Sequence, residues 1–585
     1  MTITQSKSKN STSLYVTKCT YNNGTRSSRI IEKLGTVAEL QEKLGDGIDP
    51  IKWANEYAQE LNRKEKEGQR EIIVRYSPVK QIAKDERHLF SAGYLFIQKI
   101  YHELRLHKVC KRIADKYNFE FDLDSVLSRL VYGRILFPAS KLATHELSKK
   151  FIEPPSFEIQ HIYRGLEVLA KETDFIQAEL YKNSTRIMKR KTGVLYYDCT
   201  NYFFEIEQEE GIKQYGYSKE HRPNPIVQMG LFMDGDGIPL AFSINKGNTN
   251  EQTTLKPLEK KILADFELSK FVVCTDAGLS SIGNRKYNDM GSRAFITTQS
   301  IKKLKGHLKG WALEKTGWRL PGREGRYDIS MVDDPDYIKQ FVKFFGEGFD
   351  IKMETFYKER WIKEDGLEQK LIVTYSIKYR DYQRNIRAKQ VERAEKLIST
   401  NPAKVNKTNQ NDYKRFIAKT AVTEDGEVAK TEFYSINADT IADEEVFDGF
   451  YAVCTNLDDE PASIIKINHR RWEIEDCFRI MKSEFKARPV YLKRDDRIEA
   501  HFSTCFISLL IFRILEKRIE EKFSCPRIIK ELREMDLLEV PKEGYIPVYM
   551  RTDFTDVLHE AFGFRTDFQF IAHDCMKKII AWSKK

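Results

Sequence analysis

Short apolar strands alternate with helical stretches between residues 194 and 298. The predicted strands cover residues 194–197, 226–233, 238–245, 271–275 and 294–298, and the predicted helices cover 253–264 and 281–288. Asp234-Gly235-Asp236-Gly237 is typical of a hairpin turn between the second and third strands, where its acidic residues serve turn chemistry. Three successive strands followed by helix, strand, helix and strand bury their apolar faces in a layered α/β sheet.

Two aspartates directly follow buried strands of this region. Asp198 follows residues 194–197, and Asp276 follows residues 271–275. An acidic residue at such a position often caps the next helix or turns the chain. Two carboxylates at strand ends also offer the oxygen ligands that hard divalent cations prefer. On these two residues alone, both interpretations stay open.

Residues 464–491 carry a helical pattern with one apolar side. That side is formed by Ile467, Ile474, Phe478, Met481 and Phe485, and Arg471, Glu475 and Lys482 fall on an adjacent strip. A solvated face with ion pairs between successive turns is one explanation. The other is that Glu475 joins the two aspartates in one site, because three carboxylates can hold two divalent cations about 3.5–4 Å apart for phosphoryl transfer.

Asp198, Asp276 and Glu475 together resemble the Asp-Asp-Glu triad of DDE transposases, which have an RNase H-like fold. The glutamate helix is similar to the pattern Tyr-x2-Arg-x3-Glu-x6-Lys of the insertion-sequence-four superfamily. Arg471 and Lys482 stand at the required spacings from the glutamate, and the surrounding segments RRWEIEDCFRIMKSEFKARPVY and DAGLSSIGNRKY also resemble that group. Asn468 occupies the tyrosine position, where relatives use the tyrosine to handle the DNA end, and we expect it to face the site and hydrogen-bond a phosphate.

The resemblance implies an α/β, RNase H-like catalytic core interrupted by a β-rich insertion, with a mainly helical N-terminal region. In that fold the first and fourth strands are neighbours, which would place Asp198 beside Asp276. The triad would bind two Mg²⁺ ions, with Mn²⁺ as a substitute. The residues expected to bind DNA are Arg471, Lys482, Asn468, Arg479, Lys219 and Arg222. Two basic stretches interleaved with aromatics, 302–309 and 404–419, also suit phosphate contacts and base stacking.

The activity implied is that of an insertion-sequence transposase, which binds terminal inverted repeats and catalyses strand cleavage and strand transfer into target DNA. Cleavage of both element ends in one complex implies a homodimer. Two alternatives remain: an RNase H-like nuclease without strand transfer, and a catalytically silent, transposase-derived DNA-binding protein. Intact carboxylates at all three positions argue against the silent protein.

The chain of 585 residues is too long for one ordinary core, and we predict six parts. These are an N-terminal hairpin and charged helix (1–80), a helical, DNA-binding domain (81–191), the first part of the core (192–300), the insertion (301–445), the second part of the core with the glutamate helix (446–520), and a C-terminal tail (521–585). Within the first part, we expect residues 1–12 to be disordered and 13–34 to form the hairpin.

Composition narrows the class of protein further. A net charge of +10 suits a polyanionic partner, and 41% hydrophobic with 31% charged residues is typical of a globular chain. Nine scattered cysteines without a C-x-x-C pair indicate buried thiols in a reducing compartment. The N-terminus is polar, and the most apolar run, 502–512, is too short to span a bilayer. We therefore expect no membrane partner and a cytoplasmic location in a prokaryote, nucleoid-associated when bound.

Overall fold

The computed structural model describes residues 1–8, 11–22, 25–45, 48–68, 78–79, 81–117, 119–346, 348–400, 405, 412–422 and 428–585. They form two compact units, Met1–Glu86 and Arg87–Lys585. Part of the basic stretch 404–419, and the turn at Asn23 and Gly24, lie outside the described residues.

The first unit is a small antiparallel sheet with two helices. Its elements are β1 (Thr2–Lys7), β2 (Thr12–Asn22), β3 (Thr25–Thr36), α1 (Val37–Leu44) and α2 (Pro50–Gly68). The predicted hairpin and charged helices are confirmed. The expectation of disorder in residues 1–12 is wrong for the described ones, because β1 pairs with β2 and Ile3 packs on the core formed by Leu14, Leu40 and Ala54.

The second unit begins with the predicted run of helices. These are α3 (Tyr94–Glu103), α4 (Leu106–Tyr117), α5 (Leu123–Leu136), α6 (Lys141–Ser148), α7 (Ile159–Lys171) and α8 (Thr173–Ile187). Asp122 starts α5 by accepting a hydrogen bond from the Ser125 amide at 3.1 Å, as expected of a side chain that caps a helix. The helical N-terminal region is therefore confirmed.

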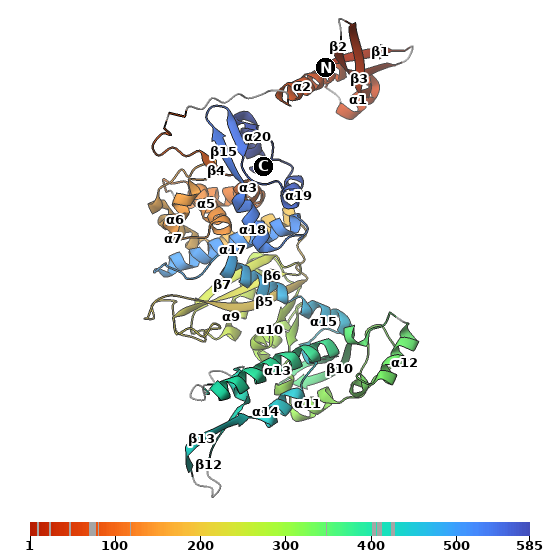
Figure 1. Cartoon of the computed structure of the whole chain (residues 1–585), viewed down its shortest axis with the longest axis vertical. Coiled ribbons are helices and arrows are strands. Elements are labelled where there is room, and N and C mark those ends of the chain that lie inside the picture. Colours follow the sequence, from red (N-terminus) through yellow and green to blue (C-terminus); the bar gives the residue numbers. More distant parts are fainter. Residues whose placement is uncertain are drawn as a thin grey trace. The chain divides into compact units, whose positions relative to one another are not determined.

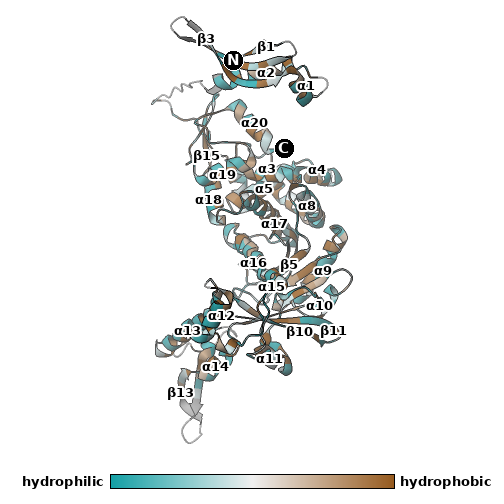
Figure 2. Cartoon of the chain, turned by 90° about the vertical axis from the view of Figure 1, so that its right-hand side faces the viewer, coloured by the Kyte–Doolittle hydropathy of each residue, from teal (hydrophilic) through white to brown (hydrophobic). Residues whose placement is uncertain are grey.

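An eight-stranded mixed sheet follows, in the order β10-β11-β14-β9-β8-β5-β6-β7. The strands are β5 (Val194–Phe203), β6 (Ile226–Asp234), β7 (Pro239–Lys246), β8 (Val272–Thr275), β9 (Ala294–Thr298), β10 (Thr355–Glu364), β11 (Leu367–Ser376) and β14 (Phe450–Thr455), with α9 (Glu251–Asp265) and α10 (Ile282–Asn288) between them. β5 pairs in parallel with β8, and β8 with β9. The predicted α/β class and the neighbouring first and fourth strands are confirmed. Figure 2 shows the strands around β5 in the brown of hydrophobic residues, as their burial requires.

The long insertion between β9 and β14 extends this sheet. Its first hairpin, β10–β11, continues the sheet beyond β14, and its second, β12 (Ile417–Val422) with β13 (Val428–Ile436), stands apart. Four helices accompany them: α11 (Gly306–Leu313), α12 (Pro335–Phe345), α13 (Ile377–Thr400) and α14 (Ala438–Glu445). β11 ends at Ser376, and the long helix α13, labelled in Figure 1, begins at the next residue.

The core is closed by α17 (Asp495–Arg518), which packs on α5, α7 and β7. Among the described residues, this helix is long and apolar enough to cross a membrane, but 94% of its most apolar window is buried inside the protein. The run 502–512 is thus part of a core helix. After it come α18 (Cys525–Glu534), β15 (Asp536–Val540), β16 (Gly544–Pro547), α19 (Asp553–Phe562), β17 (Ile571–Ala572) and α20 (His573–Ser583), and β15 pairs with β4 (Leu89–Ser91).

Candidate active site

Two aspartates lie level on adjacent parallel strands. Tyr196 of β5 pairs with Cys274 of β8, and Asp198 and Asp276 each follow two residues later. Asp276 comes directly after β8, as predicted, whereas Asp198 lies inside β5 and not at its end. The reason is that β5 keeps pairing with β6 as far as Phe203 after β8 has stopped. The predicted proximity of the two carboxylates is confirmed.

The surroundings of Asp198 disfavour its charge. Burial raises the pKa of its carboxyl to about 6, and the Asp276 carboxylate adds to this effect. The ammonium of Lys219 and the guanidinium of Arg471 act in the opposite direction, as does a hydrogen bond of 2.7 Å from the Cys199 amide to Asp198 Oδ1. A partly buried carboxylate beside another carboxylate gains free energy from an additional cation.

Asp276 has two roles at once. Its Oδ1 accepts a hydrogen bond of 3.0 Å from the Leu279 amide, so it caps the short helix Ala277–Leu279. The capping interpretation of the sequence was therefore correct for this residue. Capping does not exclude cation binding, because the Asp276 side chain stays partly exposed beside Asp198 and a carboxylate can accept several bonds.

The predicted single helix over residues 464–491 is interrupted twice. It consists of α15 (Pro461–His469), α16 (Trp472–Arg479) and a π-helical turn at Ile480–Glu484. At the first break, the Ile467 carbonyl accepts from the Tyr196 hydroxyl at 2.9 Å and from the Arg470 amide at 3.1 Å instead of continuing the helical ladder. The π turn adds a residue, so the strip expected to unite Glu475 with Lys482 is not continuous.

Glu475 lies at the rim of this site, with 65% of its side chain exposed. Its nearest cation is Arg471, whose Nη2 is 3.9 Å from Glu475 Oε1. Within the described part of the chain, no three His, Cys, Asp or Glu side chains gather closely enough to hold a metal ion. The structure thus unites the two aspartates and Arg471, and it leaves the glutamate outside their cluster.

Lys482 lies on the π turn, near Asp198. Its Nζ lies 3.5 Å from Glu220 Oε1 and 5.4 Å from the centre of the Tyr202 ring, and 15% of its side chain is exposed. Burial lowers the pKa of this ammonium to about 8, helped by the nearby charge of Lys219 and opposed by Asp198. Lys482 is therefore a further cation close to Asp198.

The remaining predicted DNA-binding cations differ in their surroundings. Lys219 turns inward: its ammonium donates to the Cys199 carbonyl and lies 3.2 Å from Glu251 Oε1, beside Asp198. Arg222 lies over the Phe203 ring at 4.2 Å and is half exposed. Arg479 is exposed on α16 and pairs with Asp476 at 2.6 Å. Lys219 is thus a counter-ion of the carboxylates, and the two arginines are the ones open to solvent.

Asn468 does not face the site as expected, because it is buried beneath it, with 4% exposure. Its Nδ2 donates to the Tyr451 hydroxyl at 2.9 Å, and the Cys274 thiol donates to its Oδ1 at 3.7 Å. The Tyr451 hydroxyl also bonds the Thr298 hydroxyl at 2.6 Å, and Arg471 Nη1 donates to that same Thr298 oxygen at 3.3 Å. Asn468 therefore supports Arg471 through two residues that the sequence did not single out. Only the register of β9 against β14 reveals them.

The donor set fits divalent cations in part. Asp198 and Asp276 offer carboxylate oxygens, which hard cations prefer, and a bound cation would offset the burial and the neighbouring carboxylate that raise the pKa of Asp198. Lys219 and Arg471 now supply part of that charge from the sides. Glu475 is available, since its contact with Arg471 is long and exposed.

Comparison with known proteins identifies a family for this chain. Residues 201–511, more than half of the chain, match the family model of the transposase DDE domain; the match includes Asp276 and Glu475 and begins just after Asp198. No curated protein matches the chain. Similar solved structures include a piggyBac transposase synaptic complex with hairpin DNA (9% identity, 76% of this chain and 78% of that chain, TM-score 0.34) and a Mos1 transposase paired-end complex with the left transposon end (13% identity, 54% and 84%, TM-score 0.14).

Proposed function

Because the chain belongs to the transposase DDE-domain family, whose members cut and join DNA, we propose that it is the transposase of an insertion sequence of the insertion-sequence-four superfamily. The observation that carries this proposal is the pair Asp198 and Asp276, level on parallel neighbouring strands and flanked by Arg471 and Lys482. The substrates would be the terminal inverted repeats of the element and a target DNA, bound by a homodimer in the cytoplasm of a prokaryote.

Enzymes of this family generally use divalent metal ions. In this chain Asp198, Asp276 and Glu475 would hold them, and we infer Mg²⁺, with Mn²⁺ as a substitute. Such ions, when bound, lower the pKa of an attacking water or hydroxyl and stabilise the leaving oxygen.

The protein's own residues would position the scissile phosphate. Arg471 is fixed by Thr298 and offers a planar fork to two phosphate oxygens, while Lys482 offers a point charge on the other side of Asp198. Lys219 would hold Asp198 ionised and in place before substrate arrives, because its ammonium is beside that carboxylate.

The test is cleavage of labelled DNA that carries the boundaries of the element. We expect nicks at the boundary in Mg²⁺ and none in EDTA, followed by joining of the freed 3′ ends to a target duplex. A control duplex with scrambled ends should be cut far less. Cutting of both duplexes alike would favour a nuclease without strand transfer, and binding without cutting would favour a silent DNA-binding protein.

DNA affinity should depend on pH through Lys482. Its pKa in the free protein is about 8, and a bound phosphate would raise it, so the proton is held more tightly in the complex. Affinity is then constant below pH 8 and falls above it, by up to about tenfold per pH unit. The measurement is fluorescence anisotropy with labelled element ends from pH 7 to 9.5.

A matched variant checks the assignment of this pH dependence. Lys482→Arg keeps its charge throughout the range, so its affinity should stay flat. A fall of equal slope in wild type and Lys482→Arg would show that another group is responsible.

A further inference from the structure

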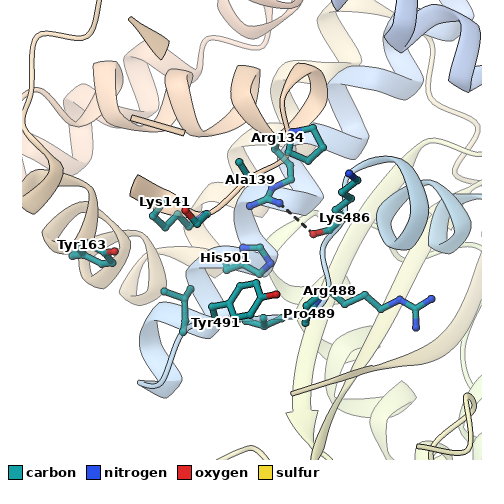
Figure 3. Close-up of a pocket in the computed structure, with 13 residues that line it drawn as sticks. Arg134, Ala139, Lys141, Tyr163, Lys486, Arg488, Pro489, Tyr491 and His501 are labelled. Atoms are coloured by element: carbon teal, nitrogen blue, oxygen red, sulfur yellow. Dashed lines mark hydrogen bonds between the residues drawn. The ribbon is translucent and has the colours of Figure 1, made fainter. Parts of the chain in front are cut away.

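A cavity of about 270 Å³ lies between the N-terminal helices and the chain that follows the glutamate helix. Its walls come from α5, the start of α6, α7, the segment 486–492 and α17, and Figure 3 shows their side chains. The volume is near the lower limit for small-ligand sites. It has room for one nucleotide-sized group and none for a double helix.

The residues that line the cavity include five basic side chains and no acidic one: Arg134, Lys141, Lys486, Arg488 and His501. Three of the five, Arg134, Lys141 and His501, are buried, with 5%, 6% and 5% exposure, and Figure 3 shows them gathered together. Burial lowers the pKa of His501 well below its usual value, so the buried cations are Arg134 and Lys141. Buried cations in proteins are normally paired with carboxylates. Buried basic side chains that share a cavity with no acidic residue are therefore unusual.

The Lys141 ammonium has no hydrogen-bond or ion-pair partner among the residues that the structure describes. Arg134 donates from Nη1 to the Phe485 carbonyl at 3.0 Å, while its buried Nε has no acceptor. His501 Nε2 is 3.1 Å from the Ala487 carbonyl oxygen. Burial and the charge of Arg134 lower the pKa of Lys141 to about 7, and no neighbouring carboxylate opposes this effect. An anion entering the cavity would satisfy both cations.

Helix α6 begins at this cavity and adds to its preference for anions. Ser140 caps the helix by accepting from the Ala143 amide at 3.2 Å, and both Ser140 and Lys141 line the cavity. The first turn of a helix carries partial positive charge. The helix end and the two buried cations, neither of which pairs with a carboxylate, thus favour the same kind of ligand group.

Aromatic and proline side chains also line the cavity, and one of its basic residues shares an ion-pair partner with the candidate active site. Tyr163 and Pro489 line it, as does Tyr491, which is 72% exposed. Arg488 extends away from the other basic residues in Figure 3 and pairs with Glu220, the same carboxylate that Lys482 contacts. Glu220 therefore links Arg488 of the cavity to Lys482 of the candidate active site.

We propose that this cavity binds one unpaired nucleotide of a DNA strand, with its phosphate between Lys141 and Arg134 and its ring against Tyr491. The phosphate satisfies the buried cations, and base–aromatic stacking on an exposed tyrosine tolerates any base. The proposal rests on the proposed function in one respect, the source of the nucleotide.

The test compares Lys141→Met with Lys149→Met, which removes the same charge from the exposed end of the same helix. The probes are a labelled single-stranded oligonucleotide, free thymidine 5′-monophosphate and inorganic phosphate. We expect Lys141→Met to bind the oligonucleotide at least about tenfold more weakly and Lys149→Met to bind it as wild type does. Without ligand, Lys141→Met should melt no lower than wild type, because it removes an unpaired buried charge.

Equal oligonucleotide affinity of Lys141→Met and wild type would overturn the proposal. Tighter binding of the free nucleotide than of the strand would overturn its assignment to DNA. If Lys141→Met fails to fold, Tyr491→Ala, at an exposed position, must show the weaker binding instead. If wild type cleaves the element boundary but Lys141→Met binds the oligonucleotide as tightly as wild type does, only the proposed role of the cavity is refuted. Lys141-dependent binding without any cleavage would refute the proposed function alone.

Discussion

Asp198→Asn is expected to lower metal-dependent DNA cleavage by roughly a thousandfold or more while the protein stays folded. The amide keeps the size of the side chain and can still accept from the Cys199 amide, but it loses the charge that a divalent cation requires. The measurement is the rate of boundary cleavage at saturating Mg²⁺.

Although Asp198→Asn should lose activity, it should gain stability relative to wild type at neutral pH. The raised pKa of Asp198 means that the folded state disfavours its ionised form, so its contribution to stability is greatest at low pH and is lost as pH rises from about 4 through about 6. Above that range Asp198→Asn should therefore be more stable than wild type, by about 1–2 kcal/mol after allowance for partial exposure. At pH 4 the difference should vanish. A variant that is inactive only because it is damaged would instead be less stable at both pH values.

Two neighbouring acidic residues of α16 provide a matched pair of variants, which tests whether Glu475 in particular is needed for cleavage. Glu475→Gln should lose cleavage as Asp198→Asn does, whereas Asp476→Asn, which removes the same charge from the next residue, should cleave as wild type does because Asp476 pairs with Arg479. Full activity in Asp198→Asn or Glu475→Gln would place the catalytic carboxylates elsewhere.

Much of the core was predictable because its signals are local. Apolar runs bounded by Gly, Asp and Pro gave the positions of β6, β7, β8 and β9, and the hairpin turn at Asp234 linked two of them. The neighbouring position of Asp198 and Asp276 required more, namely a fold in which β5 and β8 pair. Only the resemblance supplied that pairing, since a sequence states which segments are strands but not which ones meet.

The missed features all depend on contacts between distant residues. The break before α16 arises where the Tyr196 hydroxyl donates a hydrogen bond to the Ile467 carbonyl, and the two residues are more than two hundred positions apart in the sequence. The burial of Asn468 follows from Tyr451 on a strand whose register no local pattern fixes. The pairing of β4 with β15 joins nearly the two ends of the second unit, and β4 is only three residues long. Such pairings depend on packing rather than propensity.

Arg190→Met is expected to destabilise the second unit by about 3–5 kcal/mol, the largest stability change among our predictions. Arg190 Nε donates to Asp234 Oδ2 at 2.5 Å, and the two side chains are 2% and 0% exposed. Arg190 also donates to the Ser184 hydroxyl and to the carbonyls of Ile238 and Pro239. It thereby ties the end of α8 to the β6–β7 hairpin, and its loss would leave the Asp234 carboxylate buried without a counter-charge.

Lys191 provides the matched control, one residue away. It pairs with Asp236 of the same turn at 2.8 Å, but 62% of its side chain is exposed, so Lys191→Met should change stability little. Adding Asp234→Asn to Arg190→Met should recover part of the loss, because it removes the unpaired charge. Urea unfolding measures all three. Similar losses in Arg190→Met and Lys191→Met would mean that the hairpin is held by its backbone pairing. No recovery in the double variant would assign the cost to lost packing and hydrogen bonds of the guanidinium, and not to the buried carboxylate.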